Sequence, residues 1–129
     1  MRLSLSRILR EPSLNGIYRL SGARELEPSL DGRLLSDKKT LLTALGLALE
    51  FPEYYAPNWD ALEECLQDMS WRSGPITLRI RHADRLLPPL RHTLMDIFAE
   101  AARTWASQGR CCSLFLSGLR DADQLPLVT

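Results

Sequence analysis

The most informative stretch of this chain is Phe51-Pro52-Glu53-Tyr54-Tyr55-Ala56-Pro57-Asn58-Trp59-Asp60-Ala61-Leu62, which continues as Glu63-Glu64-Cys65-Leu66. Pro52 ends a preceding leucine-rich segment, and Asn58 is a good N-cap for a new helix. Beyond that cap, apolar residues recur at helical spacing, namely Leu62, Cys65, Leu66 and Met69. The stretch therefore predicts two helices joined by a turn that carries an aromatic pair.

The same region is acidic, although the chain as a whole is neutral. The 16 acids and 16 bases of its 129 residues cancel. Between Thr40 and Trp71 there is no lysine or arginine, but the acids are Glu50, Glu53, Asp60, Glu63, Glu64 and Asp68. Such a row is either an ordinary solvated helix face or a docking surface for a basic partner. The residues Asp60, Glu63 and Glu64 share one face, because residues three or four apart on a helix are neighbours.

The tyrosine pair favours a docking surface over a solvated face. Adjacent residues in extended chain point in opposite directions, so one of Tyr54 and Tyr55 can enter the core while the other stays exposed. Tyrosine beside acids is a common composition at protein interfaces. Two core tyrosines would be the alternative.

Predicted strands and helices alternate along the rest of the chain. The strands are expected at residues 17–20, 76–80 and 112–116, and the helices from a cap at Ser36 to Pro52, from Asn58, and from Pro88 to a stop at Gly109. Residues 1–15 are expected to be an irregular or marginally helical extension, 23–33 a loop, and 118–129 a tail. This alternation predicts an α/β domain with a small, mostly parallel sheet.

Composition excludes several classes of protein. The length suits one domain with a continuous core. A formal charge of zero argues against direct nucleic-acid binding, which usually needs a basic protein. No apolar run approaches the roughly 18 residues of a membrane span, and the N-terminal residues do not form a secretory signal. The odd number of cysteines, 3, fits reduced thiols. We therefore expect a cytoplasmic protein.

Catalytic and metal sites are poorly supported by the sequence. Asp60 and Glu64 could be interpreted as an acid–base pair, but carboxylates on one helix face lack the opposed geometry of a cleft. His82 and His92 are too scattered to be metal ligands, and the adjacent Cys111 and Cys112 are expected to pack as small hydrophobic residues. We expect no catalytic residue, metal or cofactor.

The segments Pro52-Glu53-Tyr54-Tyr55, Asn58, Asp60-Ala61-Leu62 and Cys65-Leu66 closely resemble the core segment of the barstar family of intracellular ribonuclease inhibitors. Weaker similarities continue at Gly74-Pro75-Ile76-Thr77-Leu78, Phe98-Ala99-Glu100-Ala101 and Leu114-Phe115-Leu116-Ser117. The resemblance covers residues 16–117, with an insertion around 23–35. It implies a three-stranded parallel sheet packed with helices, and no enzymatic activity.

The resemblance also implies a binding face formed by the second helix and the loop before it. The partner-binding positions would be Tyr54, Asn58, Trp59, Asp60, Glu63, Glu64, Gln67, Met69 and Glu100. The residue types at Tyr54, Asn58, Asp60 and Glu100 match the family, whereas Glu64 replaces its most important aspartate. Glu63 and Met69 each replace a tryptophan. The implied partner is a ribonuclease with a basic active site, of the extracellular or toxin type, which would make the chain an immunity protein or antitoxin. The alternative is a non-inhibitory module of the same fold that binds a basic regulatory partner.

Overall fold

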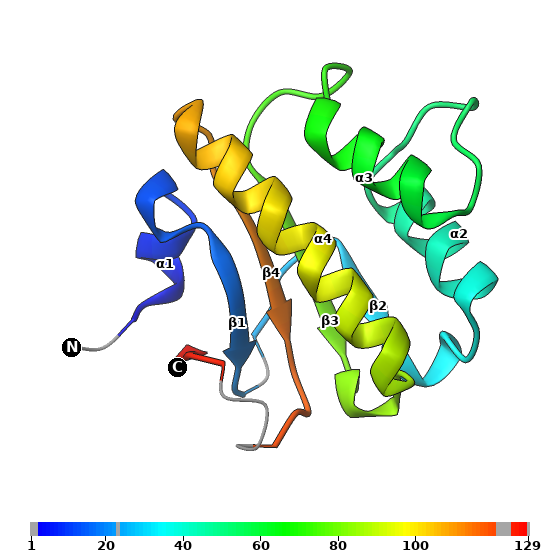
Figure 1. Ribbon diagram of the computed structural model, residues 1–129. Coiled ribbons are helices and arrows are strands. Elements are labelled where there is room, and N and C mark those ends of the chain that lie inside the picture. Colours follow the sequence, from blue (N-terminus) through cyan, green and yellow to red (C-terminus); the bar gives the residue numbers. More distant parts are fainter. Residues whose placement is uncertain (1–2, 23, 121–124, 129) are drawn as a thin grey trace.

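The computed structural model describes residues 3–22, 24–120 and 125–128, and its centre is a parallel β-sheet (Figure 1). Within these residues the sheet has five strands in the order β2-β3-β4-β1-β5. They are β1 (Gly16–Leu20), β2 (Ser29–Asp31), β3 (Ile76–Arg81), β4 (Cys112–Leu116) and β5 (Leu127–Val128). Every paired neighbour is parallel. The predicted α/β class with a parallel sheet is confirmed, but the expected number of three strands is wrong.

The two additional strands are short and lie at the edges of the sheet. Strand β2 falls in the segment 23–33, which we expected to be a loop, and pairs with β3 from Ser29 opposite Arg79. Strand β5 falls in the expected tail and pairs with β1 from Leu127 opposite Arg19. Residues 23, 121–124 and 129 of these two segments lie outside the described residues. Three-residue and two-residue strands are too short to show a clear alternation of polar and apolar side chains.

The helices are α1 (Leu5–Ile8), α2 (Lys38–Ala48), α3 (Trp59–Asp68) and α4 (Pro88–Ser107), with short 3-10 turns at Pro12–Leu14, Gly32–Leu34 and Ala83–Arg85. Asp37, not Ser36, caps α2, since its carboxylate accepts a hydrogen bond of 2.8 Å from the Thr40 amide. The Asn58 cap of α3 is confirmed, with 2.8 Å between its Oδ1 and the Ala61 amide. Gly109 follows α4 with a positive φ of 72°, as expected of a helix stop.

The main core lies between the sheet and helices α2, α3 and α4. It contains buried leucines of α2 and α3, the strand residues Leu78 and Leu114, and Phe98 and Trp105 of α4. The indole Nε1 of Trp105 donates a hydrogen bond of 2.9 Å to the Leu66 carbonyl. This bond satisfies a buried donor and fixes α4 against α3, so the orientation of α3 is set by the core.

A second apolar cluster, which we call the back layer, covers the opposite side of β1 and β4. Its fully buried members are Ile8 of α1, Phe115 of β4 and Val128 of β5, and Leu5 of α1 with Tyr18 and Leu20 of β1 complete it. Asn15 ties this layer to the main body: its Nδ2 donates to the carbonyls of Ala102 and Arg110, and its Oδ1 accepts from the Cys112 amide. The described part of the N-terminal extension is therefore packed rather than loose.

Candidate protein-binding face

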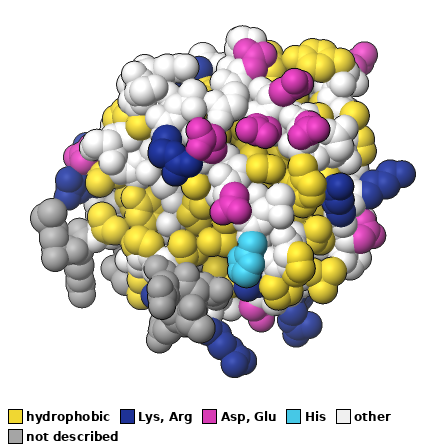
Figure 2. All heavy atoms as spheres, viewed as in Figure 1, with side chains coloured by type: hydrophobic (Ala, Val, Ile, Leu, Met, Phe, Trp, Pro, Cys, Tyr) yellow, Lys and Arg dark blue, Asp and Glu magenta, His cyan; other side chains and the backbone are white. Residues whose placement is uncertain are grey.

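Helix α3 buries one side and presents a row of carboxylates on the other. Leu62, Cys65 and Leu66 are buried, because they recur on the side that faces the core. The exposed acids on the other side and in the preceding loop, together with the exposed Tyr54, form what we call the acidic face: Glu53, Tyr54, Asp60, Glu63, Glu64 and Asp68. Figure 2 shows acidic side chains gathered over the part of this view where Figure 1 places α3.

The carboxylates of the acidic face are not neutralised from within the described part of the chain. No lysine or arginine there forms an ion pair with Glu53, Asp60, Glu63, Glu64 or Asp68. Like charges at this spacing destabilise a helix slightly. Asp60 offsets part of that repulsion because it lies in the first turn, near the positive end of the helix dipole. The face is thus an unpaired concentration of negative charge on a rigid helix.

The two tyrosines of the loop point in different directions, as the sequence pattern predicts. Tyr54 is 74% exposed, whereas the Tyr55 hydroxyl donates a hydrogen bond of 2.8 Å to the Leu42 carbonyl in α2. The Tyr55 ring also packs edge to face on Phe51, with 4.8 Å between the ring centroids. Burial raises the pKa of Tyr55 to about 12. Tyr55 therefore anchors the loop to α2 and leaves Tyr54 at the surface.

Tyr54 lies beside the carboxylates of α3. Its pKa is raised first by partial desolvation and then by the nearby Cys65, Asp68 and Glu64 groups. The pKa of Cys65 is also raised, first by burial and then by Glu64 and Asp68. Tyr54, Glu64 and Asp68 thus form one cluster, with an aromatic ring and two carboxylates available to a partner.

The remaining predicted residues differ in their exposure. Asn58 is exposed but is also the cap of α3, and Trp59 is half-buried, with the Lys38 ammonium 5.9 Å from its ring centroid. Gln67 is half-buried. Glu100 is exposed on α4 and forms an ion pair with Arg103 one turn further on. The Glu100 carboxylate is therefore already paired in the free protein, unlike the carboxylates of α3.

Met69 was expected to contact a partner, and the structure contradicts this. Its side chain is completely buried in the main core. Met69 is the C-cap of α3 and has a left-handed backbone with a φ of 44°. It nevertheless continues the apolar spacing of Leu62 and Leu66, so its side chain joins them in the core. A surface position was implied only by the resemblance, and the helical spacing was the more reliable signal.

Sequence reasoning missed a hollow beside the acidic face, between α2 and the loop that follows it. This cavity of about 240 Å³ has walls that include Gly46, Leu47, Phe51, Glu53, Tyr55 and Pro57, and we call it the α2 groove. Leu47 is 78% exposed. The available signal was the helical spacing of α2, since Leu47 lies off the stripe made by the buried Leu41, Leu45 and Leu49.

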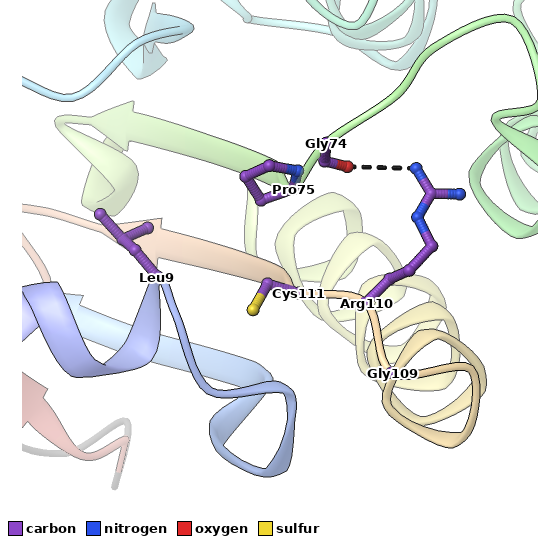
Figure 3. A pocket seen from close by; sticks show the side chains of 6 residues that line it. All are labelled: Leu9, Gly74, Pro75, Gly109, Arg110 and Cys111. Atoms are coloured by element: carbon purple, nitrogen blue, oxygen red, sulfur yellow. Dashed lines mark hydrogen bonds between the residues drawn. The ribbon is translucent and has the colours of Figure 1, made fainter.

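A larger hollow of about 310 Å³ lies at the end of the sheet where β3 and β4 begin (Figure 3). Its wall includes Leu9, Pro75, Arg110 and Cys111. The Arg110 guanidinium lies 3.6 Å from the Trp105 ring centroid and donates a hydrogen bond of 3.1 Å to the Gly74 carbonyl. These contacts hold the cation against the protein, so Arg110 acts as a structural brace between α4 and the loop before β3.

The described residues offer no other recognisable chemistry. They contain no group of three or more histidine, cysteine, aspartate or glutamate side chains placed to hold a metal ion. Burial raises the pKa of Cys111, and that of Cys112 to about 12, so the adjacent thiols are not activated nucleophiles. All three cysteines are free. Among the described helices, none is long and apolar enough to cross a membrane.

The fold and the acidic face together define a class: a small α/β protein with a row of exposed carboxylates on one helix. The particular family is established by comparison. The family described as Barstar (barnase inhibitor) matches residues 27–117, and the chain belongs to this family. Members of this family are inhibitors rather than enzymes. No curated protein matches the chain. The match begins after β1, so neither β1 nor the back layer's N-terminal helix falls within it.

Proposed function

We propose that the chain inhibits a ribonuclease by docking the acidic face over the enzyme's basic active site, so that RNA cannot enter. The observation that carries this proposal is the set of unpaired carboxylates on α3 beside the exposed Tyr54. Family membership supports an inhibitor of barnase-like enzymes. The cations that hold RNA phosphates in such an enzyme would pair with carboxylates instead, and the negative face would attract the basic enzyme over a distance.

Within this mechanism, Glu64 has the central role. It lies in the middle of α3 and shares its neighbourhood with Tyr54 and Asp68. In a complex its carboxylate would lose contact with water and pair with an active-site cation. Asp60, Glu63 and Gln67 would form the surrounding contacts, and Asn58 and Trp59 would fix the start of the helix. Met69 would contribute through the core alone.

Glu100 would extend the contact to α4, but its existing ion pair with Arg103 would reduce the binding free energy that it contributes. The Glu100 carboxylate pairs with Arg103 in the free protein. An enzyme cation must therefore displace Arg103 or share the carboxylate with it. Because both side chains are exposed, their ion pair is worth only about 0–1 kcal/mol, so this displacement is inexpensive.

The target would be a ribonuclease of the extracellular or toxin type, with the chain protecting the cytoplasm as an immunity protein or antitoxin. Barnase itself is one candidate, but Glu63 and the buried Met69 remove two aromatic contacts that the family resemblance implies. A related ribonuclease with a differently shaped cleft fits these residues better. No cofactor or direct contact with nucleic acid is part of the mechanism.

The proposal is tested by titrating the chain into RNA-cleavage assays with barnase and with basic ribonucleases purified from the same host. We expect the activity of one enzyme to fall linearly to zero at one equivalent. The matched control is Glu25→Gln, which removes one exposed carboxylate outside the acidic face and should inhibit as well as wild type. If no enzyme loses activity at a large excess of chain, the proposal is wrong.

A second candidate is the non-inhibitory module that binds a basic regulatory protein. The observation that favours it is the burial of Met69, which leaves Tyr54 as the large exposed aromatic residue of the acidic face. Aromatic residues are frequent hot spots, so a face with fewer of them binds less tightly. In the same assay, a module would bind its partner without lowering the rate of RNA cleavage.

A further inference from the structure

The α2 groove differs from the acidic face in its chemistry. Its walls are mainly apolar and aromatic and include Leu47, Pro57, Phe51 and Tyr55. Glu53 is the charged residue among those that line it. The cavity of about 240 Å³ is below the roughly 300–1,000 Å³ of small-molecule sites. It therefore suits a single protruding side chain better than a complete ligand.

The groove is already formed in the free protein. The Tyr55 hydroxyl is fixed to the Leu42 carbonyl, and Phe51 packs on both Tyr55 and Trp71. Gly46 makes the ring position of Tyr55 possible, because a Cβ on Gly46 would lie 2.7 Å from the Tyr55 Cε2 atom. A side chain that enters the groove would therefore meet rigid walls, which reduces the entropy lost on binding.

The charges around the groove select a cationic occupant. The chain has no lysine or arginine between Thr40 and Trp71, so none of the residues that line the groove is a cation. The Glu53 carboxylate has no ion-pair partner among the described residues. An arginine combines an apolar stem with a planar cation that stacks on aromatic rings and pairs with a carboxylate through two hydrogen bonds. Lysine is more strongly hydrated and lacks the planar group.

The groove is continuous with the acidic face through the backbone of one loop. Glu53 lines the groove, and the next residue, Tyr54, lies beside Glu64 and Asp68 on the other side. We propose that the α2 groove receives an arginine side chain of the same basic protein that docks on the acidic face. The identity of that protein as a ribonuclease rests on the proposed function, whereas the selectivity of the groove for arginine rests on the groove alone.

Short blocked peptides test the groove without any ribonuclease. Acetyl-Gly-Arg-Gly-amide, its lysine analogue and its norleucine analogue would be titrated into the isotopically labelled chain, with amide shifts recorded by NMR. We expect the arginine peptide to give saturable shifts at Gly46, Leu47, Phe51 and Tyr55, and to bind more tightly than both analogues. If lysine binds as well as arginine, or if the shifts fall on α3 alone, the proposal is wrong.

A matched pair of charge variants locates the carboxylate that matters. Glu53→Gln keeps the shape of the groove wall but removes its charge, and it should weaken binding of the arginine peptide about fivefold. Glu25→Gln removes the same charge from an exposed position outside the groove and should leave the affinity unchanged. Equal losses in both variants would mean that the peptide responds to net charge only, which would overturn the proposal.

A binding experiment with a ribonuclease separates this inference from the proposed function. In the double variant Glu53→Gln with Leu47→Ala, affinity for an inhibited ribonuclease should fall about tenfold, mainly through faster dissociation. An unchanged affinity would overturn the assignment of the groove to the same partner. If wild type inhibits no ribonuclease but binds the arginine peptide selectively, the proposed function fails and the groove retains its arginine selectivity.

Discussion

The acidic face and the back layer differ in the kind of side chain that they contain and in its exposure to solvent. On the acidic face, the side chains of α3 that point outward are charged and have no ion-pair partner among the described residues. In the back layer, α1 and β5 bring apolar side chains onto Tyr18, Leu20 and Phe115, and the cluster is almost completely buried. The first region therefore leaves its charged side chains exposed to solvent, whereas the second packs its side chains within the fold. Substitutions in the two regions should therefore affect different measurements.

The largest expected effect belongs to Glu64→Ala. Removal of this carboxylate would leave an enzyme cation buried and unpaired in the complex, which typically costs about 2–5 kcal/mol of binding free energy. Glu53→Ala, at the edge of the face, should cost much less, and Tyr54→Ala and Asp60→Ala should fall between them. Ribonuclease titration gives the affinities of these variants. Thermal melting is the control, since removal of a repelled surface charge should not destabilise the chain.

The contrast between the two regions would be wrong if Glu64→Ala unfolded the protein, because the acidic face would then contribute to folding. It would also be wrong if the variant inhibited the ribonuclease as strongly as wild type. In that case the central contact of the family would not apply to this chain.

Ile8→Ala should lower the stability of the protein and leave its inhibition of a ribonuclease unchanged. Ile8 is completely buried in the back layer, and loss of such a side chain costs about 2–5 kcal/mol of unfolding free energy. Urea unfolding measures this loss, and the folded variant should inhibit a ribonuclease as well as wild type. The control is Ser6→Ala on the exposed side of α1, which should change stability by less than about 0.5 kcal/mol. A wild-type midpoint for Ile8→Ala would show that the back layer does not stabilise the fold.

Gly46→Ala tests how the loop of the acidic face is attached to α2, because Gly46 lies in α2 and the ring that it faces, Tyr55, belongs to that loop. In an ordinary helix this change stabilises by up to about 1 kcal/mol. Here the new Cβ would lie 2.7 Å and 2.8 Å from two ring atoms of Tyr55, whose hydroxyl is fixed to the Leu42 carbonyl. We therefore expect a loss of about 1–3 kcal/mol of unfolding free energy. Chemical denaturation measures it, and Leu47→Ala, at an exposed neighbour, is the control.

Salt should affect the acidic face and leave the back layer unchanged. Exposed charges act over only about 10 Å at 0.1 M ionic strength. The association rate with a ribonuclease should therefore fall severalfold from low to moderate salt, as stopped-flow measurements would record. The dissociation rate should change much less, because buried pairs are screened less. A flat association rate would mean that the acidic face is not the docking surface.

The smallest expected effect is a change of stability in alkaline solution, caused by two side chains that remain protonated at neutral pH, Cys112 and Tyr55. Burial raises the pKa of Cys112 from its ordinary value near 9 to about 12, and that of Tyr55 from near 10 to about 12. Between those values the unfolded chain has lost protons that the folded chain keeps, so stability falls as pH rises from about 9 to 12. Unfolding midpoints measured across this window should fall less steeply in Cys112→Ala. An equal slope would exclude Cys112 as a cause.

The sequence predicted the fold where the patterns were long and the caps were distinctive. Asn58 and the apolar spacing after it defined α3, and the alternation at 17–20 and 76–80 located β1 and β3. The edge strands β2 and β5 were missed because pairing with a neighbour, rather than local pattern, makes such short segments extended. The cap of α2 was misplaced by one residue, since Ser36 and Asp37 are both good caps and only the backbone geometry decides between them.

The charges of the acidic face could be predicted from the sequence, but the burial of individual side chains and the shape of the α2 groove could not. Periodicity correctly placed the acids of α3 on one face. The tyrosine pair divided as predicted, but through a turn at Glu53 and Tyr54 rather than through extended chain, since the Tyr55 amide donates a hydrogen bond of 3.0 Å to the Pro52 carbonyl. Met69 was placed both in the apolar spacing of α3 and among the partner-binding positions, and only the first assignment agrees with its burial. The spacing of α2 could have predicted the exposure of Leu47, but the shape of the α2 groove depends on the approach of Tyr55 to Gly46 across a turn. The pairing of Glu100 with Arg103 was available from their spacing of three residues.

The hydrogen bond between Tyr55 and Leu42 has a consequence for the speed of recognition. A loop that must fold onto its partner slows association, since only part of the encounters find it in a competent shape. Here the loop before α3 is held to α2 in the free protein, so Tyr54 and Glu64 keep their relative positions before any encounter. Diffusion and electrostatic attraction would then limit capture, which is the kinetic property that a protein needs when it must stop an enzyme before the enzyme reaches RNA.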